Sequence, residues 1–151
     1  MDPEVHLSHS AAETFALGEA TARRLGARGV VWLIGPLGAG KTVFAKGFFA
    51  GYGIPPERVT SPTFTLINRY REDPPLHHAD LYRLGDAREI DDLGLDDALE
   101  APGVAVVEWG ERLAGVLPPP AVEVTIGVAA DETRRIELRW RQSEPAPDQQ
   151  R

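Results

Sequence analysis

The chain has 151 residues with 16 basic and 23 acidic side chains, a formal net charge of −7. This length fits one domain with a self-sufficient core. The absence of cysteine excludes disulfide scaffolds, Cys-based zinc sites, iron–sulfur clusters and thiol nucleophiles. The acidic balance argues against a whole-molecule nucleic-acid binder.

The sequence shows no segment that predicts a membrane or secretory destination. Its longest strictly apolar run covers residues 30–34, whereas a transmembrane helix needs about 20 such residues. Residues 1–10 have neither the basic start nor the apolar core of a secretory leader. We therefore expect a cytoplasmic protein that does not associate with membranes.

The first third of the chain predicts a helix, a buried strand and a second helix. Ser10 and Glu13 form a capping box, so a helix should begin there and end at the glycines of residues 26–29. Residues 28–34 contain the β-branched and aromatic run of a buried strand. A glycine-rich turn then leads into a helix over about residues 42–52.

The rest of the chain is dominated by strand patterns. The predicted strands cover residues 63–71, 76–81, 104–109, 122–128 and 136–140, of which the last two should form an antiparallel hairpin that turns near Asp131. Residues 86–100 are strongly acidic and predict one or two short helices with a solvated face. We expect an α/β domain over residues 1–141, with a mixed, largely parallel sheet flanked by helices and a C-terminal antiparallel hairpin, and then a frayed polar tail at 142–151.

The sharpest motif is Gly-Pro-Leu-Gly-Ala-Gly-Lys-Thr at residues 35–42, which matches the P-loop pattern G-x-x-x-x-G-K-[ST]. Glycines allow the loop to wrap a phosphate closely, and the helix that follows adds its unpaired amides and positive dipole end. Lys41 would reach the β- and γ-phosphates, and the Thr42 hydroxyl would bind Mg²⁺. The predicted strand before the loop and helix after it are the context that the motif requires.

A P-loop NTPase also needs a carboxylate on a neighbouring strand. Glu108 closes the apolar stretch 104–107 and is the first candidate, with a strand-end surface carboxylate as the alternative. Asp80 is the second candidate, with a solvated turn residue as the alternative. Either carboxylate could orient the attacking water, and the sequence does not choose between them.

Four other features lie near these candidates in the sequence. His77 and His78 are adjacent in a predicted strand, so they point to opposite faces and cannot readily grip one ion; packing or surface roles are favoured, with His78 the one nearer the site. Trp109 is either a core residue or a wall of the nucleotide pocket. Residues 60–63 predict either a γ-phosphate-sensing loop or a proline turn. An Asn-Lys pair for guanine is absent, which favours ATP over GTP.

The combination of motifs resembles the TsaE (YjeE) family, the P-loop ATPases of bacterial tRNA threonylcarbamoyladenosine biosynthesis. The resemblance covers about residues 8–140. The matching elements are residues 35–42, 59–66 (Val-Thr-Ser-Pro-Thr-Phe-Thr-Leu), 78–84 (His-Ala-Asp-Leu-Tyr-Arg-Leu) and 106–112 (Val-Val-Glu-Trp-Gly-Glu-Arg). The Ser-Pro-Thr-Phe and Asp-Leu-Tyr-Arg-Leu elements make it specific. Val43 stands where a second Thr is common.

The resemblance implies roles for individual residues. Lys41, Asp80 and Glu108 would be catalytic, and Mg²⁺ would be bound by Thr42, Glu108 and Asp80. Residues 61–63 resemble the family's switch-like loop, and Arg134 best matches an arginine that approaches the nucleotide. The residues expected to bind ATP are Gly35, Gly38, Ala39, Gly40, Lys41, Thr42, Val43, Thr63, Trp109 and Arg134.

The resemblance also implies a cellular role and partners. Family members bind the proteins TsaD and TsaB, which transfer the threonylcarbamoyl group to adenosine 37 of tRNA, and use ATP to support turnover of that pair. The chain would then be a slow, partner-dependent ATP hydrolase that meets tRNA only through the complex. Two rival functions are a small-molecule or nucleotide kinase and a docking module that binds nucleotide without useful hydrolysis.

Overall fold

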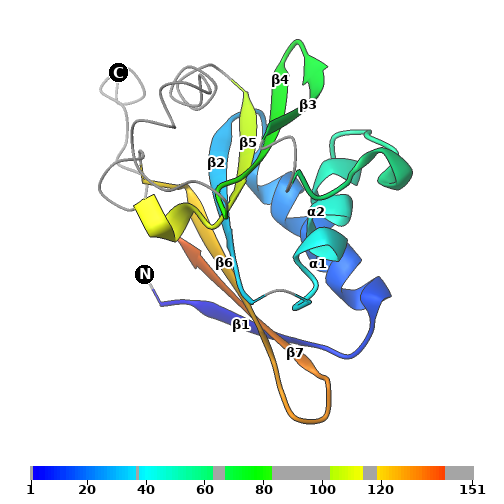
Figure 1. Ribbon diagram of the computed structural model, residues 1–151, viewed down its shortest axis with the longest axis vertical. Coiled ribbons are helices and arrows are strands. Elements are labelled where there is room, and N and C mark those ends of the chain that lie inside the picture. Colours follow the sequence, from blue (N-terminus) through cyan, green and yellow to red (C-terminus); the bar gives the residue numbers. More distant parts are fainter. Residues whose placement is uncertain (1, 37, 63–66, 83–102, 114–118, 142–151) are drawn as a thin grey trace.

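In the computed structural model, the described residues are 2–36, 38–62, 67–82, 103–113 and 119–141. They form one mixed sheet with two helices on one face (Figure 1). The elements are β1 (Glu4–Ser8), α1 (Ala11–Leu25), β2 (Gly29–Ile34), α2 (Lys41–Ala50), η1 (Pro56–Arg58), β3 (Ile67–Glu72), β4 (Pro75–Asp80), β5 (Val104–Glu108), η2 (Gly110–Leu113), β6 (Val122–Val128) and β7 (Arg134–Trp140). No described helix has both the length and the apolar character needed to cross a membrane.

The sheet order is β1-β7-β6-β2-β5-β4-β3. The four central strands, β6, β2, β5 and β4, run parallel to one another. The outer pairs β1–β7, β6–β7 and β3–β4 are antiparallel. This arrangement confirms the expected α/β fold with a mixed sheet, a parallel centre and a C-terminal hairpin.

Both helices begin where the sequence predicts a local signal. The Ser10 hydroxyl accepts a hydrogen bond from the Glu13 amide at 3.1 Å, and the Glu13 carboxylate accepts one from the amide of His9, so the first turn of α1 is capped from both sides. α1 ends at Gly26, whose φ of 81° favours glycine. α2 begins directly after the glycine-rich loop, with Gly40 as its N-cap.

The core has two layers because side chains alternate across the central strands. Val31 and Leu33 of β2 face the helices and pack with Phe44, Phe48 and other buried residues of α2. Trp32 faces the other side of the sheet, where it meets Ala105 and Val107 of β5. Burial on both faces explains why β2 and β5 appear as continuous apolar runs in the sequence.

Strand β1 escaped the sequence-based prediction. Its apolar residues Val5 and Leu7 are 46% and 60% exposed, so the alternation does not mark a buried face. The strand is held by antiparallel pairing with β7, from Glu4 opposite Leu138 to Ser8 opposite Arg134. The predicted helices at 86–100, the start of the predicted strand at 63–66 and the tail at 142–151 lie outside the described residues.

Candidate functional site

The glycine-rich loop lies at the carboxyl end of the central strand β2, where ligands bind in open α/β sheets. Gly38 and Gly40 have φ angles of 80° and 105°, which disfavour a residue with a side chain. A Cβ atom on Gly35 would lie 2.6 Å from the carbonyl oxygen of Ile126 on β6. Glycines at these positions therefore permit the loop to close tightly against the sheet.

The loop presents backbone amides at the start of α2. The amide of Phe44 donates to the Gly40 carbonyl at 3.0 Å. The amides of Lys41, Thr42 and Val43 precede this bond, and the first amides of an α-helix have no acceptor within the helix. Together with the positive end of the helix dipole, they form an anion-binding surface.

Lys41 is a buried cation that faces this surface. Its side chain is 6% exposed, and its Nζ has no hydrogen-bond acceptor among the described residues. Nζ lies 3.9 Å from Oε1 of Glu108 and 4.1 Å from the centre of the Trp109 ring. Burial lowers the pKa of Lys41, and the charges of Glu108 and then Asp80 oppose this shift. An ammonium group with no hydrogen-bond acceptor among the described residues is suited to an anionic ligand.

Two carboxylates lie side by side opposite Lys41. Glu108 is the last residue of β5, Asp80 is the last residue of β4, and the parallel pairing of these strands puts them in register. Both are buried. Oδ1 of Asp80 accepts a hydrogen bond from the Tyr82 amide at 2.9 Å. Adjacent acidic groups at this edge of the sheet can bind a cation or polarise water.

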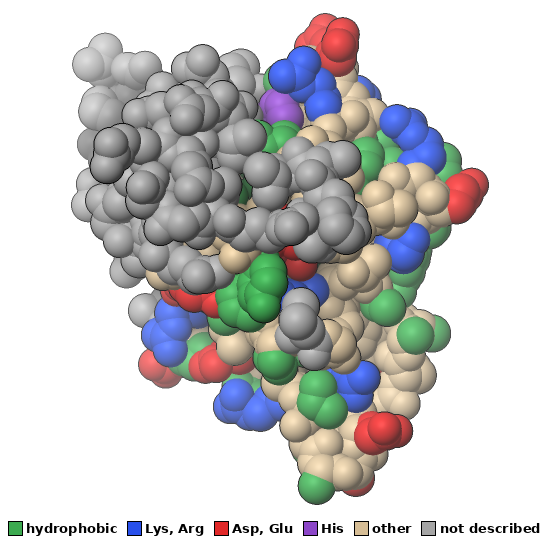
Figure 2. All heavy atoms as spheres, in the orientation of Figure 1, with side chains coloured by type: hydrophobic (Ala, Val, Ile, Leu, Met, Phe, Trp, Pro, Cys, Tyr) green, Lys and Arg blue, Asp and Glu red, His purple; other side chains and the backbone are tan. Residues whose placement is uncertain are grey.

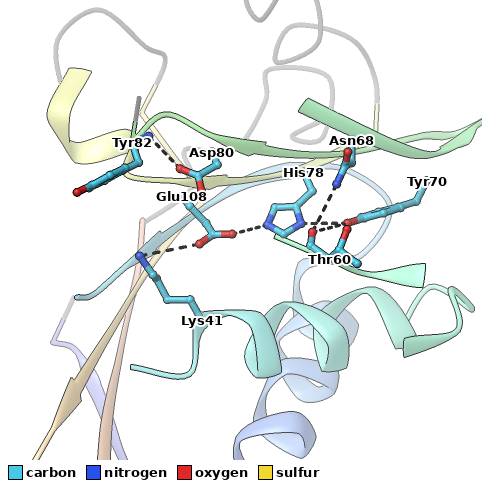
Figure 3. Close-up of polar contacts among 8 residues, drawn as sticks. All are labelled: Lys41, Thr60, Asn68, Tyr70, His78, Asp80, Tyr82 and Glu108. Atoms are coloured by element: carbon cyan, nitrogen blue, oxygen red, sulfur yellow. Dashed lines mark hydrogen bonds and ion pairs between the residues drawn. The ribbon is translucent and has the colours of Figure 1, made fainter. Parts of the chain in front are cut away.

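The structure adds His78, to which the sequence patterns gave only a secondary place. The side chain is fully buried, and its Nε2 lies 2.7 Å from Oε2 of Glu108 (Figure 3). As expected for neighbours on a strand, His77 diverges from it and accepts a hydrogen bond from Nε of Arg69 at 3.1 Å. The useful signal was the alternation along β4: His78 and Asp80 are two residues apart and share a face.

Trp109 packs against the core on the second face of the sheet and also lines a cavity beside Lys41. Its backbone φ is 65°, an unusual value for a tryptophan. The ring is half-buried over Lys41 and packs at a tilt against the Tyr82 ring, with an angle of 51° between the ring planes and 5.1 Å between the ring centres. Trp109 thus has features of both alternatives left open by the sequence, and its contact with a nucleotide stays a prediction.

A cavity of about 350 Å³ brings most of the predicted site residues together. Its lining comprises Gly38, Gly40, Lys41, Thr42, Val43, Ser61, Asp80, Glu108, Trp109 and Arg134. Gly35 and Ala39 belong to the loop but are not among the residues that line this cavity. The Ala39 amide donates to the Pro36 carbonyl at 3.2 Å, and Ala39 is fully buried. Thr63 lies outside the described residues.

A second, adjoining cavity of about 520 Å³ shares three lining residues with the first, namely Gly40, Val43 and Arg134. Its other walls come from the β1–α1 junction at residues 8–14 and the β6–β7 turn at residues 131–133. Arg134 stands between the two cavities and donates from Nε to the Ala39 carbonyl at 2.9 Å. The two cavities thus meet where the glycine-rich loop passes into α2.

Comparison with known proteins places this geometry in a family. Residues 8–136 match the family model described as threonylcarbamoyl adenosine biosynthesis protein TsaE. The chain is 43% identical to the TsaE protein of Treponema pallidum over 130 residues, 86% of this chain and 96% of that protein. It is also 43% identical to TsaE of Bacillus subtilis over 125 residues, covering 82% and 77% of the two chains.

A solved structure agrees with the sequence relatives. The crystal structure of YdiB from Bacillus subtilis superimposes with a TM-score of 0.73 at 33% identity, covering 91% of this chain and 84% of that chain. The glycine-rich loop, Lys41, Asp80 and Glu108 all lie within residues 8–136, the part of the chain that matches the family model. The chain belongs to the TsaE family, the threonylcarbamoyl adenosine biosynthesis proteins.

Proposed function

We propose that this protein binds ATP with Mg²⁺ and hydrolyses it to support the enzymes that install threonylcarbamoyladenosine at position 37 of tRNA. The observation that carries the proposal is Lys41: a buried ammonium with no hydrogen-bond acceptor in the described structure, beneath the first amides of α2 and opposite two buried carboxylates. Phosphate oxygens would satisfy both the ammonium and the amides.

The residues opposite Lys41 fit a magnesium ion. Thr42 follows Lys41 on α2 and lines the same cavity as Asp80 and Glu108. A hydroxyl and one or two carboxylates are the donors that Mg²⁺ takes alongside water and phosphate oxygens. Bound there, the ion would neutralise charge on the β- and γ-phosphates. Glu108 and Asp80 would hold it, and either carboxylate could orient the attacking water.

The larger cavity fits the remainder of the nucleotide. It begins at Gly40 and Val43, where the loop passes into α2, and has a volume of about 520 Å³. We assign the adenosine moiety to it and the terminal phosphates to the smaller cavity. Arg134, which borders both, would then lie beside the phosphate chain.

The proposal extends to partners. TsaD and TsaB are the expected binding partners, and contact with tRNA is proposed to be indirect, through that pair. In the coloured part of the face in Figure 2, acidic and basic side chains are interspersed, and they do not form there a broad basic surface of the kind that binds an RNA backbone. A site completed only against its partners would make the isolated chain slow.

The test is phosphate release from Mg-ATP by the purified chain, alone and with TsaD and TsaB from the same organism. We expect weak activity alone and strong stimulation by the pair. Asp80→Asn and Glu108→Gln should fold yet lose most hydrolysis, while Glu57→Gln, on an exposed carboxylate, should retain it. ATP binding without hydrolysis in either condition would overturn the hydrolase assignment and favour the docking module.

Binding is tested separately by calorimetry. Lys41→Ala should weaken ATP affinity, whereas Arg23→Ala, on a side chain 70% exposed on α1, should not. Unchanged affinity in Lys41→Ala would contradict the assignment of the phosphate site. Transfer of the labelled γ-phosphate to a small molecule instead of water would show that the protein is a kinase and not a hydrolase.

A further inference from the structure

A buried chain of polar contacts runs from the loop after η1 to the carboxylate of Glu108 (Figure 3). The Tyr70 hydroxyl lies 3.2 Å from the Thr60 carbonyl oxygen and 3.2 Å from Nδ1 of His78, and it can donate its one hydrogen to either of them. Nε2 of His78 lies 2.7 Å from Oε2 of Glu108. Tyr70, His78 and Glu108 are all buried, so water does not compete for these contacts.

Apolar packing fixes the middle of this chain. The Phe49 ring of α2 packs at 4.8 Å from the Tyr70 ring and 5.6 Å from the His78 imidazole, measured between ring centres. A carboxylate only accepts hydrogen bonds, so Nε2 of His78 carries the hydrogen that points to Glu108. The imidazole is therefore held in one orientation with its donor aimed at the site.

This contact makes the two oxygens of Glu108 different. Oε2 is taken by His78, whereas Oε1 faces Lys41 at 3.9 Å. Rotation of the carboxylate would break a short buried hydrogen bond. Glu108 consequently presents one defined oxygen, Oε1, to the cavity that contains Lys41 and Asp80. Outer partners of this kind set the direction of a ligating or catalytic carboxylate.

At its other end, this series of polar contacts reaches a loop that hydrogen bonds hold in place. Nζ of Lys46 on α2 donates to the carbonyl oxygens of Pro56 and Val59 at 2.7 and 2.8 Å. The Thr60 carbonyl receives a further hydrogen bond, from Nδ2 of Asn68 at 3.4 Å. The next residue along, Ser61, lines the phosphate cavity. Lys46, Asn68 and Tyr70 thus hold this loop through its backbone carbonyls, and Tyr70 also contacts His78, the partner of Glu108.

We propose that His78 is a positioning residue, which fixes the Glu108 carboxylate and, through Tyr70, couples its orientation to the loop at Thr60. This inference rests on the proposed hydrolysis for its kinetic consequence, but the coupling itself is a property of the folded chain. His78 acts through Glu108 and does not touch the nucleotide. Its loss should therefore affect turnover more than binding.

The kinetic test uses variants that change the contact but keep the packing. His78→Leu should lower kcat at least tenfold with KM for ATP within about twofold, because the P-loop amides and Lys41 still bind the phosphates. His78→Gln, whose amide can donate to Glu108, should recover part of the loss. Tyr70→Phe should lower kcat about threefold. His77→Gln, the matched control on the opposite face of β4, should leave kcat unchanged.

A double-mutant cycle separates positioning from a general structural effect. If His78 acts only through Glu108, adding His78→Leu to Glu108→Gln should change kcat by less than twofold. Additive losses, or equal losses in kcat for His78→Leu and the His77→Gln control, would overturn the inference. Circular dichroism and thermal midpoints of all variants identify any that fail to fold.

Nuclear magnetic resonance provides a readout that does not need hydrolysis. At fixed pH, wild type should show an exchange-protected imidazole proton on Nε2 of His78 that shifts in Glu108→Gln and in Tyr70→Phe. The Ser61 amide should shift in His78→Gln. Absence of these shifts would refute the coupling even if the protein hydrolyses ATP. If these resonances shift in a protein that does not hydrolyse ATP, the coupling is supported and only the hydrolase assignment is refuted.

Discussion

Helix α2 carries the amides that are proposed to bind phosphate, and its position depends on a close backbone contact with α1. A Cβ atom added at Gly47 would lie 2.0 Å from the carbonyl oxygen of Phe15, and one added at Gly18 would lie 2.3 Å from that of Phe44. An ordinary contact needs at least 3.4 Å, so Gly47→Ala must push the helices apart by roughly 1.4 Å. The obstacle is backbone, which no change of rotamer relieves.

The cost follows from these distances. Overpacking of a rigid site destabilises by about 3 kcal/mol, and the higher helix propensity of alanine returns about 1 kcal/mol. We therefore expect a net loss of about 2 kcal/mol in the free energy of unfolding, or about 4–8 °C in Tm for a chain of this size. ATP affinity should fall as well, because α2 moves with its first amides.

Urea denaturation followed by circular dichroism measures the loss, and calorimetry measures ATP affinity. Gly127→Ala on β6 is the matched control, because a Cβ there meets nothing within 4 Å. It should change stability by less than about 0.5 kcal/mol. A Gly47→Ala variant as stable as wild type would refute the reasoning, since it would show that α1 and α2 can separate without loss of core packing.

Three further outcomes are expected. Ser10→Ala removes the side-chain cap of α1 and should cost about 1 kcal/mol in urea denaturation; no loss would contradict the cap. Burial and then the Arg69 guanidinium lower the pKa of His77 below its ordinary 6.5, so the unfolded chain binds a proton that the folded chain does not. The contribution of His77 to the free energy of unfolding should therefore be fully present above pH 6.5 and should decline below it by up to about 1.4 kcal/mol per pH unit. His77→Gln should reduce this slope. Urea denaturation at several pH values measures it. Arg134→Ala removes the donor to the Ala39 carbonyl and should raise KM for ATP several-fold with a smaller change in kcat; an unchanged KM would separate Arg134 from the nucleotide.

The parts of the site that the sequence predicts are those specified locally. The residues of the P-loop motif are contiguous in sequence. Its glycines at residues 38 and 40 have the positive φ angles that glycine at these positions predicts. The strand before it and the helix after it follow from an apolar run and a glycine boundary. The alternation at residues 122–128 likewise identifies β6, because one face of that strand is buried and the other is not.

The parts that were missed depend on register between distant segments. The contact between His78 and Glu108 joins residues 30 apart in sequence, and it exists only because β4 and β5 pair in parallel with Asp80 opposite Glu108. The bond from Arg134 to Ala39 spans 95 residues. A local sequence pattern specifies neither the order nor the register of the strands. Such contacts can therefore be identified only once the fold is known.

The charges at this edge of the sheet fit the proposed phosphate-binding role better than a purely stabilising one. Lysine, aspartate and glutamate are seldom buried without full pairing, yet Lys41, Asp80 and Glu108 are each at most 6% exposed. Lys41 has no hydrogen-bond acceptor in the described structure, and its distance to Glu108 is too long for a close ion pair. A core built only for stability would replace such groups with apolar side chains at little loss. Here the fold tolerates an unsatisfied cation next to fixed carboxylates, and binding of a phosphate chain is the event that would satisfy it.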